Sequence, residues 1–172
     1  PAEVGTAHHL FMQFCDFAAA GVPGGVEQEL KRLADKRILS PEQAAAVDKA
    51  KIAAFFASSL YRDLMAQSKV RREFKFSVLV PAAQYYPVAA DAPEEKVLLQ
   101  GVIDCLIGTP EGYVILDFKT DRVSQSGLAA RAEQYRPQLE AYALAVREVF
   151  GRPVKKSVLY FFHTGSVWEW GS

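Results

Sequence analysis

Residues 101–120 read GVIDCLIGTPEGYVILDFKT, and this stretch decides the fold. It joins two segments of strand-like composition, at about 97–107 and 113–119, through the letters TPEG. Proline, glycine and small polar residues favour tight chain reversals. The stretch therefore predicts a β-hairpin of two antiparallel strands.

The hairpin would bring two acidic residues together. If the reversal pairs Gly108 with Tyr113, the same register pairs Asp104 with Asp117. Directly paired residues of antiparallel strands point to one face, with Cβ atoms roughly 4.5–5.5 Å apart. Lys119 lies two residues after Asp117 and shares that face. A slip of one residue would turn one aspartate away. We therefore expect two carboxylates and an ammonium to converge.

This convergence has two interpretations. Buried carboxylates are costly unless they are paired, hydrogen-bonded or bound to a metal. Asp117 is the single charge within the run 113–118. Lys119 would then form a structural ion pair with Asp117 or Asp104, or the three residues would form a reactive centre. The residue types alone leave both interpretations open.

The first third of the chain predicts helices. Apolar residues recur at helical spacing after Thr6, which we expect to be an N-cap, and again over 26–36 and 41–67. The third helix starts with SPEQ at 40–43, which combines an N-cap serine, a proline at the first helical position and a capping-box glutamine. A break is expected near 58–59.

The remainder predicts strands around one helical region. We expect strands at 70–80, 97–107, 113–119, 154–162 and 167–170, a surface connection over 84–96, and a helix over 137–150 that Pro137 separates from a shorter one. This order predicts one mixed α/β domain over 1–172, mainly helical over 1–67, with a sheet core and a helix over 70–172.

Composition excludes several classes of protein. Half of the 172 residues are hydrophobic and the formal net charge is zero, which argues against a disordered, polybasic or acidic chain. Apolar runs are far shorter than the roughly 20 residues of a membrane span. Two cysteines without a CxxC pattern disfavour a zinc ribbon or a disulfide scaffold. We expect a soluble cytoplasmic protein and, because the sequence opens with Pro1, a domain taken from a longer chain.

Four short motifs occur in a distinctive order. They are GTAHH at 5–9, Asp104 in GVID, DFK at 117–119 and QLEAY at 138–142. Together they resemble the PD-(D/E)XK nucleases of the RecB type, whose GTxxH element makes His9 the counterpart of the metal-binding histidine. The wording is most similar to the C-terminal nuclease domain of the bacterial AddA helicase-nucleases. The resemblance implies a restriction-endonuclease-like mixed β-sheet flanked by helices, with an N-terminal helical portion.

The resemblance also implies a metal site. Its ligands would be His9, Asp104, Asp117 and the backbone carbonyl of Phe118. Oxygen ligands suit Mg²⁺, and the imidazole also admits Mn²⁺. The ion would polarise the scissile phosphate and supply an activated water. Lys119 would orient that water or stabilise charge in the transition state; beside two carboxylates it stays protonated, so we do not assign it as the general base.

Gln138 and Tyr142 lie four residues apart on one helix face and would position Lys119 or the DNA strand. Without the resemblance, the residue types favour Tyr142 as a core residue and Gln138 as its polar neighbour. Glu73 resembles an acidic element on the first strand of these nucleases, and its alternative is a structural pair with Arg72 or Lys75. His8 and His163 are not assigned to the site.

The resemblance implies a Mg²⁺-dependent deoxyribonuclease. The resemblance implies cleavage of a DNA single strand fed by a helicase motor, during double-strand break processing and recombinational repair. Its partners would be the rest of an AddA-like chain and an AddB-like subunit. Two alternatives stay open: a catalytically silent module of the same fold that binds DNA or docks to a partner, and a free-standing nuclease.

Overall fold

The computed structural model describes residues 2–66, 68–86 and 94–171. Five strands form one mixed sheet in the order β1-β2-β3-β4-β5, in which β3 and β4 are parallel and the other neighbours antiparallel. The strands are β1 (Lys69–Pro81), β2 (Lys96–Thr109), β3 (Gly112–Lys119), β4 (Val154–Phe161) and β5 (Ser166–Gly171). The sheet confirms the predicted mixed α/β class.

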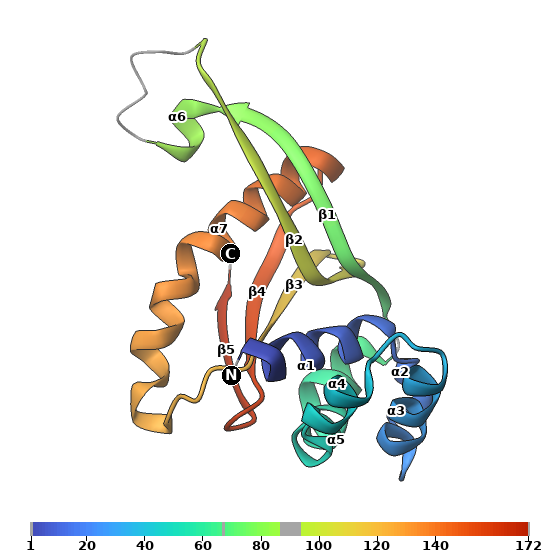
Figure 1. Ribbon diagram of the computed structural model, residues 1–172. Helices are drawn as coiled ribbons and strands as arrows, with labels where there is room; N and C mark the ends of the chain where they lie inside the picture. Colours follow the sequence, from blue (N-terminus) through green and yellow to red (C-terminus); the bar gives the residue numbers. More distant parts are fainter. Residues whose placement is uncertain (1, 67, 87–93, 172) are drawn as a thin grey trace.

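Helices cover the two faces of the sheet separately (Figure 1). The N-terminal group packs on one face and consists of α1 (Ala2–Phe14), α2 (Phe17–Ala20), α3 (Gly25–Asp35), α4 (Pro41–Ala46), α5 (Lys49–Ala57) and the π-helix η1 (Leu60–Met65). The long helix α7 (Leu128–Phe150) packs on the other face; the short elements α6 (Ala82–Tyr85) and η3 (Gln125–Gly127) complete the fold. Among the described residues, no helix is long and apolar enough to cross a membrane.

The β2–β3 hairpin has the predicted register. Cys105 pairs with Leu116 and Gly108 with Tyr113, and the bridge between Thr109 and Gly112 leaves a turn of only two residues. Alternate β3 residues divide between the two cores: Leu116 belongs to the core beside the N-terminal helices, and Tyr113 to the core beside α7. The central strand is therefore covered on both faces.

The helical third differs in detail from the prediction. The capping box at Ser40 is present, since its Oγ accepts from Gln43 N at 3.1 Å and its N–H donates to Gln43 Oε1 at 2.9 Å. The break predicted near 58–59 is present, since α5 ends at Ala57, and an additional break comes earlier, where Asp48 caps α5 by accepting from Lys51 N. Thr6 lies inside α1 and not at its start, and its hydroxyl donates to Ala2 O.

The predicted separation of two helices at Pro137 is wrong. A single helix α7 runs through this proline, and Figure 1 shows it curving along its length. Proline removes one backbone hydrogen bond and bends a helix without necessarily ending it. Ala132 before the proline and Leu139 after it are both buried in the same core. Packing on the sheet thus holds the two halves as one helix.

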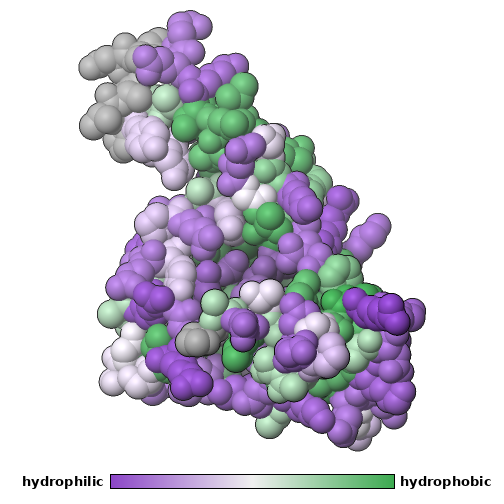
Figure 2. All heavy atoms as spheres, viewed as in Figure 1, coloured by the Kyte–Doolittle hydropathy of each residue, from purple (hydrophilic) through white to green (hydrophobic). Residues whose placement is uncertain are grey.

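The β1–β2 hairpin extends beyond the other strands. One of its faces packs through Phe76, Val80 and Leu99 into the core beside α7. Leu79 pairs with Leu98 on the other face, where they are 58% and 51% exposed. Figure 2 shows apolar side chains gathered on this projecting part, above a largely hydrophilic body.

The hairpin changes face at one residue. Arg72 points towards the N-terminal helices, whereas Phe74, two residues later, packs beside α7. Residues two apart in a regular strand share a face. Glu73 lies between them and has a positive φ of 50°. On β2, Cys105 likewise belongs to the core beside the N-terminal helices, and Ile103 belongs to the core beside α7. The strands therefore turn over at Glu73 and at Asp104, which lies opposite it.

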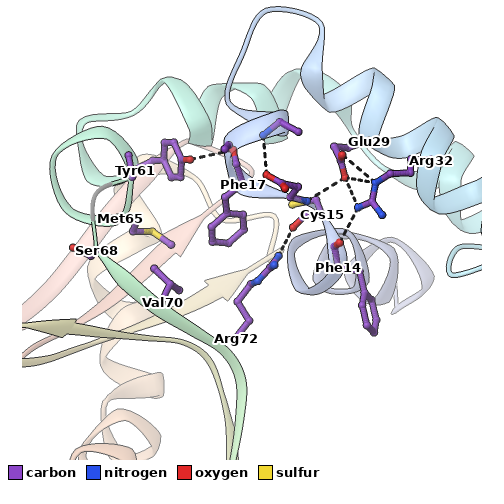
Figure 3. Close-up of a pocket in the computed structure, with 14 residues that line it drawn as sticks. Phe14, Cys15, Phe17, Glu29, Arg32, Tyr61, Met65, Ser68, Val70 and Arg72 are labelled. Atoms are coloured by element: carbon purple, nitrogen blue, oxygen red, sulfur yellow. Dashed lines mark hydrogen bonds and ion pairs between the residues drawn. The ribbon is translucent and has the colours of Figure 1, made fainter.

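A cavity of about 750 Å³ lies between the N-terminal helices and the start of β1 (Figure 3). In its wall, the Arg72 guanidinium donates to the carbonyls of Met12 and Cys15 at the C-terminal end of α1. It also lies over the Phe17 ring, 4.4 Å from the centroid. Arg72 thus fixes α1 against β1.

Glu29 is a buried charge in the same wall, with 5% of its surface exposed. Arg32 donates to its carboxylate at 2.5 to 3.1 Å, and Asp16 N donates at 3.1 Å. The hydrogen bonds from Arg32 are the main cause that lowers the pKa of Glu29, against the opposing effect of burial. Ionised Glu29 is therefore favoured in the folded state.

We expect Glu29→Gln to lower the free energy of unfolding by about 1–3 kcal/mol at pH 7, because two donors lose their charged acceptor. A lowered folded pKa stabilises the fold above the ordinary value of 4.5, and this contribution disappears as the pH falls through the folded pKa. The difference between wild type and variant should therefore shrink below about pH 4.5 in urea denaturation. Asp35→Asn is the control: it breaks the exposed Lys31 pair and should cost under about 0.5 kcal/mol. Equal losses for the two variants would contradict this assignment.

Candidate active site

Asp104 lies where β2 and β3 separate. The last backbone pair of this hairpin is Cys105 with Leu116. Beyond this pair, the Asp104 side chain accepts a hydrogen bond from β3 in place of a backbone carbonyl. Its Oδ2 accepts from Phe118 N at 2.8 Å. The carboxylate is thereby held beside the end of β3.

His9 reaches the same point from α1. Its Nδ1 lies 2.9 Å from Gly5 O, and its Nε2 lies 3.0 Å from Phe118 O and 3.4 Å from Asp104 Oδ2. The adjacent Asp104 carboxylate is the main cause that raises the pKa of His9 to about 9. α1 can approach β3 this closely because Gly5 has no side chain: a Cβ there would lie 3.0 Å from Thr120 Oγ1.

Asp117 and Lys119 form a buried ion pair. Lys119 Nζ lies 2.6 Å from Asp117 Oδ2, and the side chains of Lys119 and Asp117 are 13% and 7% exposed, respectively. Burial, followed by the negative charge of Asp104, raises the pKa of Asp117 to about 6 although Lys119 opposes the shift. The structural pair considered from the sequence is therefore present, and it lies next to Asp104.

Two residues of α7 meet this pair. Lys119 Nζ donates to Gln138 Oε1 at 3.3 Å, and Gln138 Nε2 donates to the Tyr142 hydroxyl at 3.0 Å. Tyr142 is 8% exposed and packs edge-on against Phe76. Burial is the main cause that raises the pKa of Tyr142 to about 12, and the negative charges of Asp117 and Asp104 contribute next. Tyr142 is thus both a core residue and the end of a hydrogen-bonded chain that leads to Lys119.

Glu73 also belongs to this region. It lies opposite Asp104, and burial together with the Asp104 charge raises its pKa. Arg72, one of the two structural partners considered for it, instead binds backbone carbonyls of the N-terminal helices. Lys75 opposes this rise in the Glu73 pKa less than His9 does.

Two histidines lie outside this arrangement. His8 is buried, its Nδ1 lies 2.8 Å from Val4 O, and its Nε2 accepts from Asp48 N. Burial lowers its pKa, which favours the neutral ring. His163 is exposed and lies 3.3 Å from Lys51 Nζ. Their surroundings give both a structural explanation.

Sequence reasoning assigned no role to Tyr135. Its ring centroid lies 3.8 Å from Lys119 Nζ. Tyr135 precedes Gln138 by three residues and so shares its helix face. That spacing is visible in the sequence, but the predicted separation of helices at Pro137 placed the two residues on different helices.

The donors suit a divalent cation. Phe118 O lies 3.0 Å from His9 Nε2, and Asp104 Oδ2 lies 3.4 Å from the same nitrogen. Neighbouring ligands of an octahedral Mg²⁺ with bonds of roughly 2.1 Å lie about 3.0 Å apart. Among the described residues, no three His, Cys, Asp or Glu side chains form a metal-binding group as placed. Such a group is missing from the described residues because one of the three donors is a backbone carbonyl and because the Asp117 carboxylate is paired with Lys119.

Comparison of the sequence with known proteins identifies the family of this chain. A model of the PD-(D/E)XK nuclease superfamily matches residues 1–168. The chain is 42% identical to the AddA subunit of an ATP-dependent helicase/nuclease from Desulforudis audaxviator, over 96% of this chain and 14% of that protein. The proteins of the same name from Pelotomaculum thermopropionicum and Desulforamulus reducens are 43% and 40% identical, over 95% and 97% of this chain and 13% of each relative.

The chain belongs to the PD-(D/E)XK nuclease superfamily. Its relatives are AddA subunits, which confirms the resemblance drawn from the motifs. Nucleases of this superfamily typically use divalent metal ions. The chain spans only about one seventh of the length of the curated relatives that it matches.

We expect Glu73→Gly to raise the free energy of unfolding by up to about 1 kcal/mol. A left-handed φ costs a residue with a side chain roughly 1–2 kcal/mol, and glycine avoids this cost at some loss of entropy. The matched control is Lys75→Gly at the next exposed position of the strand, which should cost about 0.5–1 kcal/mol. Urea denaturation compares them, and equal destabilisation by both would show that Glu73 is not strained.

Proposed function

We propose that this chain is the nuclease domain of an ATP-dependent helicase/nuclease and that it hydrolyses phosphodiester bonds of DNA with a divalent metal ion, Mg²⁺ or alternatively Mn²⁺. One observation carries the proposal. Asp104 of β2 and the Phe118 carbonyl of β3 lie within 3.4 Å of Nε2 of His9, which comes from α1, and this group lies beside the buried pair of Asp117 and Lys119. A purely structural cluster would not need this combination of donors.

His9, Asp104, Asp117 and the carbonyl of Phe118 would hold the metal. When bound, a divalent ion polarises a phosphoryl oxygen and supplies an activated water. The oxygen donors favour Mg²⁺, and the imidazole is compatible with Mn²⁺. Asp104 already binds the backbone of β3, and Arg72 holds α1 against β1; these contacts support the proposal because they bring His9 and Asp104 together without a metal.

Lys119 would stabilise the negative charge that develops on the phosphoryl oxygens. Its ammonium is fixed by Asp117 and Gln138, and Tyr142 in turn fixes Gln138. Because the ammonium lies 2.6 Å from Asp117 Oδ2, we assign it an electrostatic role and not that of the general base.

The relatives' name, which joins a helicase and a nuclease in one subunit, supports a proposal for the substrate and partners. We propose that a helicase motor in the rest of an AddA-like chain, together with an AddB-like subunit, delivers a DNA single strand during double-strand break processing and recombinational repair in the bacterial cytoplasm. The formal net charge of zero supports delivery, because a domain that captures DNA unaided usually carries a basic surface. A silent DNA-binding or docking module is the competing function, and the presence of Asp104, Asp117 and Lys119 disfavours it.

Lys119→Ala in the full-length protein should lower kcat for cleavage of labelled single-stranded DNA in Mg²⁺ by about 10²–10³-fold, the usual effect of removing one group that stabilises transition-state charge. Lys31→Ala is the matched control, because Lys31 forms only an exposed pair with Asp35. ATP-driven unwinding should persist in both variants. Undiminished cleavage by Lys119→Ala would contradict the assigned centre, and a wild type that binds but never cuts DNA would favour the silent module.

His9→Ala should weaken Mn²⁺ binding by about 10–100-fold in isothermal titration calorimetry, because it removes the one nitrogen donor. His163→Ala is the control, since His163 is exposed and its Nδ1 lies 3.3 Å from Lys51 Nζ, away from the proposed ligands. Unchanged Mn²⁺ affinity in His9→Ala would exclude His9 as a ligand, whatever the cleavage assay shows.

A further inference from the structure

The ammonium of Lys119 has three partners of different kinds. Asp117 Oδ2 lies 2.6 Å from Nζ and Gln138 Oε1 lies 3.3 Å from it. The third partner is the face of the Tyr135 ring, whose centroid is 3.8 Å away. An ammonium carries three N–H donors on a flexible stem. The ring face is therefore a third partner of the ammonium beside its two polar ones.

We propose that Tyr135 is a positioning residue, whose aromatic face fixes the Lys119 ammonium for phosphodiester cleavage through a cation–π contact. This inference rests on the proposed function of Lys119. It names a residue outside the four motifs of the sequence. Tyr135 acts through Lys119 and need not touch the DNA.

The ring is itself fixed at its far end. The Tyr135 hydroxyl donates to Asp121 Oδ2 at 2.7 Å, and Arg131 donates to the same oxygen. Burial, followed by the hydrogen bond to Asp121, raises the pKa of Tyr135 to about 12, so the phenol remains a neutral donor. The end of β3 and the segment after it are thus joined to α7 twice, through Lys119 and through Asp121.

An aromatic face suits this position for an electrostatic reason. A further carboxylate would also hold the ammonium, but it would add a negative charge that repels a phosphate. A neutral ring attracts the cation through its quadrupole and leaves its net charge available. The side chain of Lys119 is only 13% exposed, which limits competition from water for this contact. Reactive groups must be held within about 0.5 Å of their working position.

The test varies the ring's electrons at nearly constant shape. In the full-length protein, Tyr135 is replaced by phenylalanine and then by phenylalanines with one, two and three ring fluorines, which progressively weaken the negative face. We expect kcat for cleavage of single-stranded DNA in Mg²⁺ to fall stepwise with each fluorine, by between about two- and thirtyfold over the series. KM, the melting temperature and ATP-driven unwinding should stay constant. Tyr135→Trp should retain more activity than Tyr135→Leu.

The same series in a Lys119→Ala background completes the test. If the ring acts through the ammonium, fluorination should have no effect there. A flat series in the Lys119 protein, with Lys119→Ala still strongly impaired, would overturn the role of Tyr135 and leave the proposed nuclease centre intact. Undiminished cleavage by Lys119→Ala alone would overturn both.

Discussion

The Asp104 carboxylate is the constraint on which the site depends. It occupies the position where the β2–β3 ladder ends, and it binds Phe118 N–H where a regular hairpin would continue with backbone bonds. The same oxygen lies 3.4 Å from His9 Nε2, so one side chain joins β2, β3 and α1. A regular hairpin at this point would direct the Phe118 carbonyl to a neighbouring strand and leave His9 without its acceptor.

The position of Asp104 also explains why the surrounding residues carry perturbed charges. Asp117 lies within β3, which is covered on both faces, and is buried with it, so the negative charge of Asp104 is only weakly screened there. The folded protein tolerates this repulsion because Lys119 pairs with Asp117 and α7 in turn holds Lys119. Glu73 adds a strained backbone to the same region. Strain and like charges concentrated at one place are typical of a site kept for function and not for stability.

Local sequence signals predicted the parts of the site that lie on one hairpin. The TPEG turn fixed the register of Cys105 to Thr109 against Gly112 to Leu116, but the ladder ends one residue before the predicted pair of Asp104 and Asp117, because the Asp104 side chain binds Phe118 N instead. Contacts between distant elements needed the motif resemblance, as for His9, or were missed, as for Tyr135. Pro137 misled because helix propensity is local, whereas the buried residues on both sides of the proline hold α7 together through the sheet. The positive φ of Glu73 was not predicted, because glutamate is not a residue type that favours left-handed backbone.

Charge balance links the site to the neutral composition of the chain. Glu73, Asp104 and Asp117 provide three formal negative charges, and protonated His9 and Lys119 provide two positive charges, which leaves one negative charge. A phosphodiester adds another, so the side chains alone would repel the substrate. If His9 gives up its proton to bind the proposed metal, the side chains carry two negative charges, and a divalent ion neutralises them. Since the chain as a whole carries no net positive charge to attract DNA, the ion would supply the attraction at the site, and delivery by a motor would supply the encounter.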